Sequence, residues 1–259
     1  MEVLYPMKIF TLFFLIFLFS TVQAKPLSIV SSDGFVLKGF LNYPEIKKDK
    51  YPVIIFAHQF STTHVIWSDF AKRLNQLGYA TLLIDLRGHG LSTIKNGKKV
   101  EIIPFKGGSL ANLFAVFKKS NELVNFKLIP EDIVLWIEYL KENEKIDEKR
   151  IGLVGSSLGA TSVIPVVLDE DLSFVISISP GSPSLLGDKE KFELALSSFL
   201  NPFLFVASVN DPIGSGKYIQ RYVEKTPNGI SMLLSGNKHG VSLLPRIEEM
   251  LIAFIQKHL

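Results

Sequence analysis

Six short apolar runs follow one another along the chain, each bounded by polar or turn-forming residues. Apolar runs of this length, without polar alternation, are typical of strands buried on both faces of a parallel sheet. The predicted strands cover residues 53–57, 80–86, 151–154, 174–179, 203–207 and 230–234. Two further runs, 27–30 and 35–41, flank the turn sequence Ser-Ser-Asp-Gly and predict an antiparallel hairpin.

Helical spacing of apolar residues appears between most of these runs. The predicted helices cover residues 67–77, 131–142, 158–168, 190–199 and 245–258. Strands that alternate with helices indicate a doubly wound α/β fold. We therefore expect a mostly parallel eight-stranded sheet with an antiparallel N-terminal hairpin. No repeat or long Pro/Gly/Ser linker divides residues 25–259, so we expect a single domain there.

One connection, about 93–130, is much longer than a common strand-to-helix link. Apolar residues recur within it at helical spacing, at Leu110, Leu113, Phe114, Phe117 and Leu123. The spacing predicts a helix within residues 107–126. Two interpretations remain open: a small cap insertion over a site, or an extra helix packed on the rim of the sheet.

Residues 1–24 read as a secretory signal. Lys8 precedes an apolar run at 9–19, and Val22-Gln23-Ala24 suits cleavage before Lys25. The run is too short to span a bilayer. We expect an exported, periplasmic or secreted protein without a stable membrane span after cleavage; an uncleaved N-terminal anchor is the alternative. Met7 is a rival to Met1 as the true start.

The composition of the chain excludes several classes of partner, nucleophile and cofactor. The 259 residues are 47% hydrophobic, enough for a sizeable core, and the net charge of +3 is too small to indicate a nucleic-acid partner. The absence of cysteine excludes disulfides, a thiol nucleophile and thiolate metal ligands. Dinucleotide, P-loop and His-Glu-x-x-His patterns are missing, so we expect no cofactor and no metal. Oligomeric state is left open.

Gly155-Ser156-Ser157-Leu158-Gly159 directly follows the predicted strand 151–154. Gly-x-Ser-x-Gly between a strand and a helix is the pattern of a nucleophile elbow, a tight turn that exposes the serine hydroxyl. The N–H of Leu158, at the start of the new helix, then faces the space before Ser157 and can bind an oxyanion. An ordinary strand-to-helix junction is the alternative interpretation.

A nucleophilic serine needs a base and an acid that orients the base. In chains with a nucleophile elbow these follow in the order Ser, Asp, His. Only His239 and His258 lie after Ser157, and His239 lies in a Gly-rich loop past the last predicted strand, so we assign the base to it. Asp211, just after the strand 203–207, is the candidate acid. Its rivals are Asp188 and the acidic residues at 169–171.

With these motifs in place, the chain resembles the α/β-hydrolase superfamily from about residue 27 to its C-terminus. Residues 85–92, Asp-Leu-Arg-Gly-His-Gly-Leu-Ser, are similar to a strand-end motif of many members. There the motif shapes a loop, which implies a structural role for His89. The short link between Pro180 and Phe203 leaves no room for a large lid. The resemblance is therefore to compact dienelactone-hydrolase-like esterases and acyl-peptidase-type domains.

Residues 58–67, His-Gln-Phe-Ser-Thr-Thr-His-Val-Ile-Trp, resemble the His-Gly-x-Gly stretch of that superfamily. By position, the resemblance implies that the Phe60 N–H is the second oxyanion donor, with Gln59 as the rival. Gln59 and Ser61 stand where the superfamily has glycine, and His64 receives no role.

The motifs and the resemblance together predict a serine hydrolase that cleaves a carboxylic ester of a small molecule through an acyl-enzyme on Ser157. A peptidase or amidase, an acyltransferase, and a non-catalytic binding protein on the same fold are the alternatives.

Overall fold

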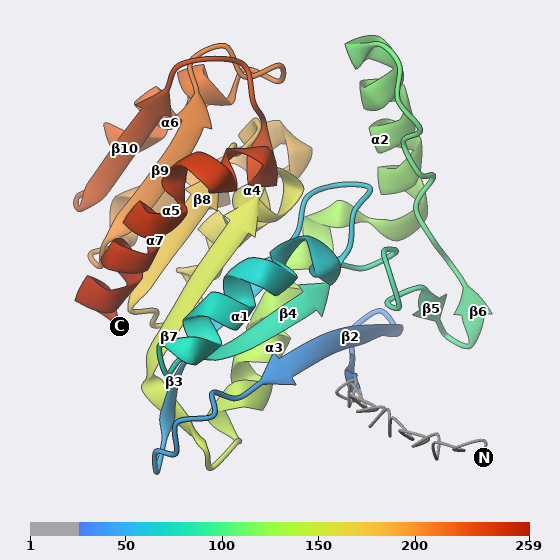
Figure 1. The fold of residues 1–259 in the computed structure, drawn as a ribbon. Helices are drawn as coiled ribbons and strands as arrows, with labels where there is room; N and C mark the ends of the chain where they lie inside the picture. The colour runs from blue at the N-terminus through green and yellow to red at the C-terminus, as the bar shows by residue number, and fades with distance from the viewer. Residues whose placement is uncertain (1–25) are drawn as a thin grey trace, which may run out of the picture.

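The computed structural model describes residues 26–259, which fold around one large mixed sheet with helices on both faces (Figure 1). The sheet order is β10-β9-β8-β7-β3-β4-β2-β5-β6, and β1 pairs with β2. The strands are β1 (Leu27–Val30), β2 (Phe35–Asn42), β3 (Tyr51–Ala57), β4 (Ala80–Asp85), β5 (Ile94–Lys95), β6 (Lys98–Lys99), β7 (Ile146–Ser156), β8 (Phe174–Ile178), β9 (Phe203–Ser208) and β10 (Gly229–Leu234).

The parallel part of the sheet consists of the six predicted buried strands, β3, β4, β7, β8, β9 and β10. Strand β2 joins antiparallel to β4, and the β1–β2 pair is the predicted N-terminal hairpin. The mostly parallel sheet with an antiparallel N-terminal edge is thus confirmed. The very short strands β5 and β6 extend it beyond the eight strands expected, because the chain after β4 folds back along β2.

Helices cover both faces of the sheet. The α-helices are α1 (Ser68–Gln76), α2 (Leu110–Val124), α3 (Ile129–Lys141), α4 (Leu158–Val166), α5 (Lys189–Ser198), α6 (Ser215–Val223) and α7 (Leu244–His258). The 3₁₀ helices are η1 (His64–Trp67), η2 (Phe126–Leu128), η3 (Pro183–Leu185) and η4 (Gly240–Leu243). Helices α1 and α7 pack on one face and α3 to α6 on the other, so neighbouring strand residues such as Ile54 and Ile55 enter different cores.

Besides β5 and β6, two further elements differ from the sequence-based expectation. Helix α6 was not predicted, although Ile219 and Tyr222 are buried at helical spacing in it. Strand β7 starts at Ile146, well before the predicted start, because the polar residues 147–150 continue the strand where it emerges from the core. The predicted signal at 1–24 lies outside the described residues. No helix within residues 26–259 is long and apolar enough to cross a membrane.

The turn from β7 into α4 requires backbone to touch backbone. A Cβ on Gly159 would lie 2.3 Å from the carbonyl oxygen of Ala57, and one on Gly155 would lie 2.5 Å from the Gly159 carbonyl oxygen. Any side chain at either position would push α4 away from the sheet. The Gly159 N–H also donates to the His58 carbonyl oxygen at 3.2 Å, so the same crossing fixes the end of β3.

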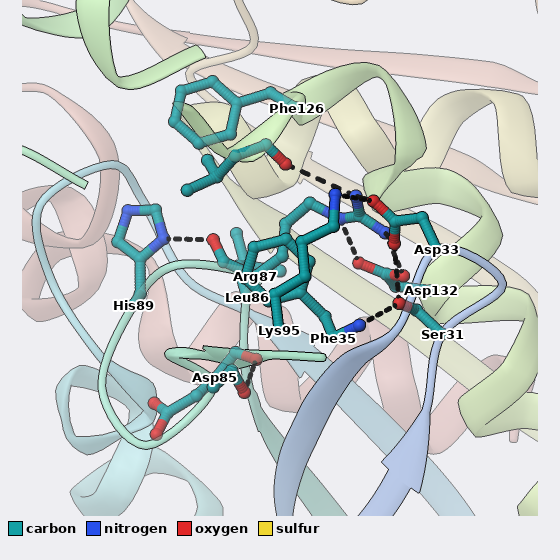
Figure 2. Close-up of polar contacts among 12 residues, drawn as sticks. Ser31, Asp33, Phe35, Asp85, Leu86, Arg87, His89, Lys95, Phe126 and Asp132 are labelled. Atoms are coloured by element: carbon teal, nitrogen blue, oxygen red, sulfur yellow. Dashed lines mark hydrogen bonds and ion pairs between the residues drawn. The ribbon is translucent and has the colours of Figure 1, made fainter. Parts of the chain in front are cut away.

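The loop after β4 is held by a fully buried arginine. Arg87 binds both carboxylate oxygens of Asp132, at 2.6 and 2.7 Å, and both of Asp33, at 3.2 and 3.3 Å (Figure 2). It also donates to the Val124 carbonyl oxygen, at the end of α2, at 3.3 Å. All five guanidinium N–H groups therefore have acceptors, which is what makes burial of the charge tolerable.

Two buried histidines form hydrogen bonds between the loops that follow β3 and β4. The Nε2 atom of His58 accepts the Leu86 N–H at 3.0 Å, while its Nδ1 faces the Gln59 carbonyl oxygen at 2.8 Å. His89 accepts the Ser61 N–H at 3.2 Å and faces the Arg87 carbonyl oxygen. Each ring is thus neutral with its proton on Nδ1. Burial lowers the pKa of His58 to about 4 and that of His89 to about 3.

The close crossing predicts that Gly159→Ala destabilises the fold by about 2 kcal/mol or more, because the added methyl meets rigid backbone. Gly181→Ala is the matched control, since its Cβ would meet the movable end of the Leu185 side chain. Urea unfolding measures both variants. An equal loss in the two would contradict the argument.

The buried histidines predict a loss of stability in mild acid. The folded pKa of His58 lies below the ordinary 6.5, so the unfolded chain binds more protons between pH 6.5 and about 4. The free energy of unfolding should fall there by up to about 1.4 kcal/mol per pH unit for this group. His58→Gln keeps an acceptor for the Leu86 N–H but does not titrate. Urea titrations between pH 7 and 5 give the free energy of unfolding at each pH. This free energy should fall less steeply with decreasing pH in His58→Gln than in the unaltered protein; equal dependence on pH in the two would refute the assignment.

Candidate active site

Ser157 lies at the turn between β7 and α4, at the carboxyl end of the parallel strands. Its φ of 52° and ψ of −108° are strained for a residue with a side chain. The Ser157 N–H donates to the Ile178 carbonyl oxygen at 2.8 Å, and its own carbonyl accepts the Thr161 N–H at 2.9 Å. The glycine crossing and these bonds hold the strained turn, which matches the geometry that the Gly-x-Ser-x-Gly motif predicts.

His239 lies in the loop after β10 and Asp211 in the loop after β9. His239 contacts Ser157 with one ring nitrogen and Asp211 with the other. The His239 Nε2 lies 2.8 Å from the Ser157 Oγ. The His239 Nδ1 lies 3.0 and 2.9 Å from the two carboxylate oxygens of Asp211. The Asp211 side chain is fully buried, whereas that of His239 is 24% exposed. The three residues named from chain order are therefore joined by hydrogen bonds.

The environment of Asp211 keeps its carboxylate ionised. Burial alone would raise its pKa, but hydrogen bonds from His239 and the Ile213 N–H, together with the nearby Ser179 hydroxyl, outweigh burial and hold the pKa below the ordinary value. An ionised Asp211 accepts a hydrogen bond from the Nδ1–H of His239, which leaves the lone pair of Nε2 facing Ser157. That tautomer is the one a general base requires.

Backbone N–H groups border the space in front of Ser157. Leu158 is the first residue of α4, so its N–H lies among the donors that a helix leaves unpaired. The N–H groups of Phe60 and Gln59 have no acceptor within residues 26–259. The next residue, Ser61, has a φ of 60°, and its N–H is held by His89. Phe60 and Gln59 thus both remain candidates for the second oxyanion donor.

An apolar cavity of about 200 Å³ opens beside Ser157 and His239. Helix α2 contributes Leu113, Phe114 and Phe117 to its wall, and Figure 1 shows this helix standing apart from the main sheet. The other lining residues are Gln59, Phe60, Phe105, Leu158, Leu185 and Ile213. The helix expected within residues 107–126 is therefore present and forms one side of the pocket.

The remaining candidates from the sequence have other contacts. His64 binds Asp85 through Nδ1 at 2.8 Å, and Asp188 caps α5 by accepting the Lys191 N–H. His258 lies at the end of α7.

Sequence reasoning missed the side-chain contacts of Gln59 and Ser179, because no local pattern marks them. No group of three or more potential metal ligands occurs in the described part of the chain.

Comparison with known proteins identifies the family and the fold. A family model described as serine aminopeptidase, S33 matches residues 48–212. An uncharacterised 31.7 kDa protein from the traX–finO intergenic region of Escherichia coli is 26% identical over 197 residues, which are 74% of this chain and 56% of that protein. The chain thus spans little more than half the length of this curated relative.

Solved structures share the fold. Est1E from Butyrivibrio proteoclasticus, determined with ferulic acid bound, has a TM-score of 0.67 at 17% identity, covering 90% of this chain and 98% of Est1E. A dienelactone hydrolase from Anabaena variabilis has a TM-score of 0.65 at 17% identity, covering 92% and 99%. Identities this low show the fold alone. Since the family model covers more than half of the chain, the protein belongs to the serine aminopeptidase S33 family of hydrolases, within the α/β-hydrolase superfamily.

Proposed function

We propose that the protein is a serine hydrolase that cleaves carboxylic esters with Ser157 as nucleophile, His239 as base and Asp211 as the orienting acid. The observation that carries the proposal is the unbroken series of hydrogen bonds from Ser157 Oγ to His239 and on to Asp211, at the mouth of a cavity. A serine hydroxyl becomes nucleophilic only when such a base is in reach.

The reaction proceeds in two halves. Ser157 Oγ attacks the ester carbonyl carbon while Nε2 of His239 takes the hydroxyl proton, and the resulting imidazolium is stabilised by the Asp211 carboxylate. His239 then gives that proton to the departing alkoxide, which leaves as an alcohol. Water attacks the acyl-Ser157 with His239 again as base, releasing the carboxylic acid and restoring the serine.

The negative charge on the tetrahedral intermediate needs fixed donors. We assign them to the Leu158 N–H and the Phe60 N–H. The Leu158 N–H is supported by its place at the start of α4, and the Phe60 N–H by its position in the stretch that resembles the His-Gly-x-Gly motif. The Gln59 N–H, which likewise has no acceptor within the described residues, is the rival donor. The hydrogen bond that the Ser61 N–H donates to His89 Nε2 fixes the backbone on the C-terminal side of Phe60.

The cavity wall indicates an apolar acyl group. Its side chains are aromatic or aliphatic apart from Gln59 and the reacting residues. Burial of an acyl chain there gains about 0.8 kcal/mol per methylene. We therefore propose that α2 acts as a cap whose apolar face selects the acyl chain, and that substrates with several methylenes or one ring beyond the carbonyl are preferred over acetyl esters.

Amide or peptide cleavage, which the family description favours, is the second candidate, since the same triad performs it when the leaving amine is protonated by His239. Acyl transfer to an alcohol and a non-catalytic binding role are the remaining alternatives. Product analysis with a p-nitrophenyl ester, a peptide anilide and an added alcohol separates the three reactions.

Ser157→Ala and His239→Ala should each lower p-nitrophenyl ester hydrolysis by about 10⁴-fold or more, because nucleophile and base act as a unit. His258→Ala is the control and should leave the rate unchanged. His258 lies at the C-terminal end of α7, whereas His239 lies before the start of that helix. Steady-state kinetics on folded, purified variants measures this. A Ser157→Ala protein that kept the original rate would exclude the mechanism.

Phe114→Ala should weaken selection for longer acyl chains, because Phe114 lines the cavity from α2. We expect the ratio of kcat/KM for p-nitrophenyl hexanoate over acetate to fall about tenfold, which corresponds to about 1.4 kcal/mol. Leu110→Ala is the control, since Leu110 is on the same helix and similarly exposed but does not line the cavity. An unchanged ratio in Phe114→Ala would argue against a cap that selects chain length.

A further inference from the structure

The backbone that directly follows His239 is held by side chains from two other strand ends. The Gly240 N–H donates to the Ser179 Oγ at 3.0 Å, and the Val241 N–H donates to the Gln59 Oε1 at 3.2 Å. The acceptors are 61 and 182 residues away in sequence. A helix start is ordinarily capped by a residue next to it. The start of η4 has such a local partner, because the Ser242 hydroxyl accepts the His239 N–H at 3.1 Å and donates to the His239 carbonyl oxygen at 2.7 Å. Ser179 and Gln59 add a second, long-range tie, which joins the His239 loop (residues 235–239) to the ends of β8 and β3.

The Gln59 side chain has a defined orientation. Its Oε1 accepts both the Val241 N–H and the Ser156 hydroxyl, which lies at 3.1 Å, and a backbone N–H can only donate. The oxygen end of the amide is therefore fixed. Gly240 makes the approach possible, because a Cβ there would lie 2.2 Å from Oε1 and 2.7 Å from the Ser156 Oγ.

Ser179 occupies an equally constrained position. It is fully buried just past the end of β8, with a φ of 54° in the left-handed region that disfavours serine. Glycine would adopt this conformation without strain. The serine hydroxyl accepts the Gly240 N–H, and its proximity to Asp211 helps to hold the pKa of that carboxyl below the ordinary value. A strained, buried serine whose hydroxyl accepts the N–H next to His239 indicates that the hydroxyl is what the position requires.

The two side chains connect the His239 loop to strand ends on either side of the nucleophile turn. Gln59 joins the loop to Ser156, the residue before the nucleophile, and Ser179 joins it to the end of β8. His239 itself comes from a loop whose residues 235–238 are exposed. Its ring is oriented by the bonds from Nδ1 to Asp211 and between Nε2 and Ser157, and the loop backbone is also bound by Ser242 and Arg246. The bonds to Gln59 and Ser179 are the ones that tie the backbone immediately after His239 to the ends of β3 and β8.

We propose that Gln59 and Ser179 are positioning residues that together clamp the His239 loop, so that Nε2 stays within hydrogen-bonding distance of Ser157. This inference rests on the proposed function and extends it. It also explains why a glutamine stands at position 59: a glycine there would leave the Val241 N–H and the Ser156 hydroxyl without this acceptor. Misplacement of a catalytic group by about 1 Å can cost on the order of 100-fold in rate.

The test measures the second-order rate at which a fluorophosphonate labels Ser157 in Gln59→Met and Ser179→Gly. Labelling reports activation of the serine whatever the natural substrate is. Gln59→Met keeps the length of the side chain but removes the oxygen, and we expect labelling to slow about 10- to 100-fold. Ser179→Gly should slow it similarly while the urea midpoint stays the same or rises, because the backbone strain is relieved.

Ser177→Ala is the matched control. Ser177 is equally buried on β8, but its hydroxyl donates to the Ala160 carbonyl oxygen instead of the His239 loop. We expect its labelling rate to equal that of the unaltered protein. A purely structural role for Ser179 would give the reverse pattern, with a lower urea midpoint and an unchanged labelling rate.

The outcomes also separate this inference from the proposed function. If the unaltered protein labels at Ser157 while both variants label at its rate, the clamp is refuted and the serine mechanism stands. If the unaltered protein does not label at all, the proposed function fails and the clamp fails with it.

Discussion

The start of α4 crosses the ends of β7 and β3 with no side chain between the backbones, and the rest of the site depends on this contact. Gly155 and Gly159 permit the crossing, and the Gly159 N–H ties it to the His58 carbonyl oxygen. The crossing leaves the backbone of Ser157 strained, with a φ of 52°. Because the turn is fixed on both sides, the serine hydroxyl projects from the carboxyl edge of the sheet instead of relaxing into a regular helix.

Everything else at that edge is placed relative to this turn. In a parallel sheet all strands end on the same side, so the loops after β3, β4, β8, β9 and β10 converge there. Loops are ordinarily the mobile part of a fold. Here buried polar side chains hold them: Arg87 anchors the loop after β4 to the end of α2, and neutral His58 and His89 link the loops after β3 and β4. The proposed clamp of Gln59 and Ser179 on the His239 loop belongs to the same pattern.

Much of this architecture could be predicted from the sequence because it rests on local patterns. The six parallel strands, the hairpin and the helix within 107–126 are confirmed, since each has a local apolar pattern. The expected burial of the last strand on both faces is wrong, because β10 lies at the edge of the sheet, where Ile230 and Leu233 are exposed. Chain order led to His239 and Asp211, and the structure brings both to Ser157. Their roles in a reaction remain our proposal.

The missed features have a common cause. Helix α6 follows a glycine-rich stretch that obscured its short apolar period, and β5 and β6 form only by pairing along β2. The contacts of Gln59 and Ser179 join residues up to 182 positions apart, so no window of sequence contains both partners. Gln59 was visible only as a departure from a glycine motif, and its meaning required the position of Gly240.

The central claim is that the fold activates one serine among many. Its most direct test is intact-mass and peptide analysis of the folded protein after fluorophosphonate treatment, with heat-denatured protein as control. The account predicts a single adduct, located on Ser157, in the folded protein and none after denaturation. An adduct on another serine, or none on the folded protein, would contradict it.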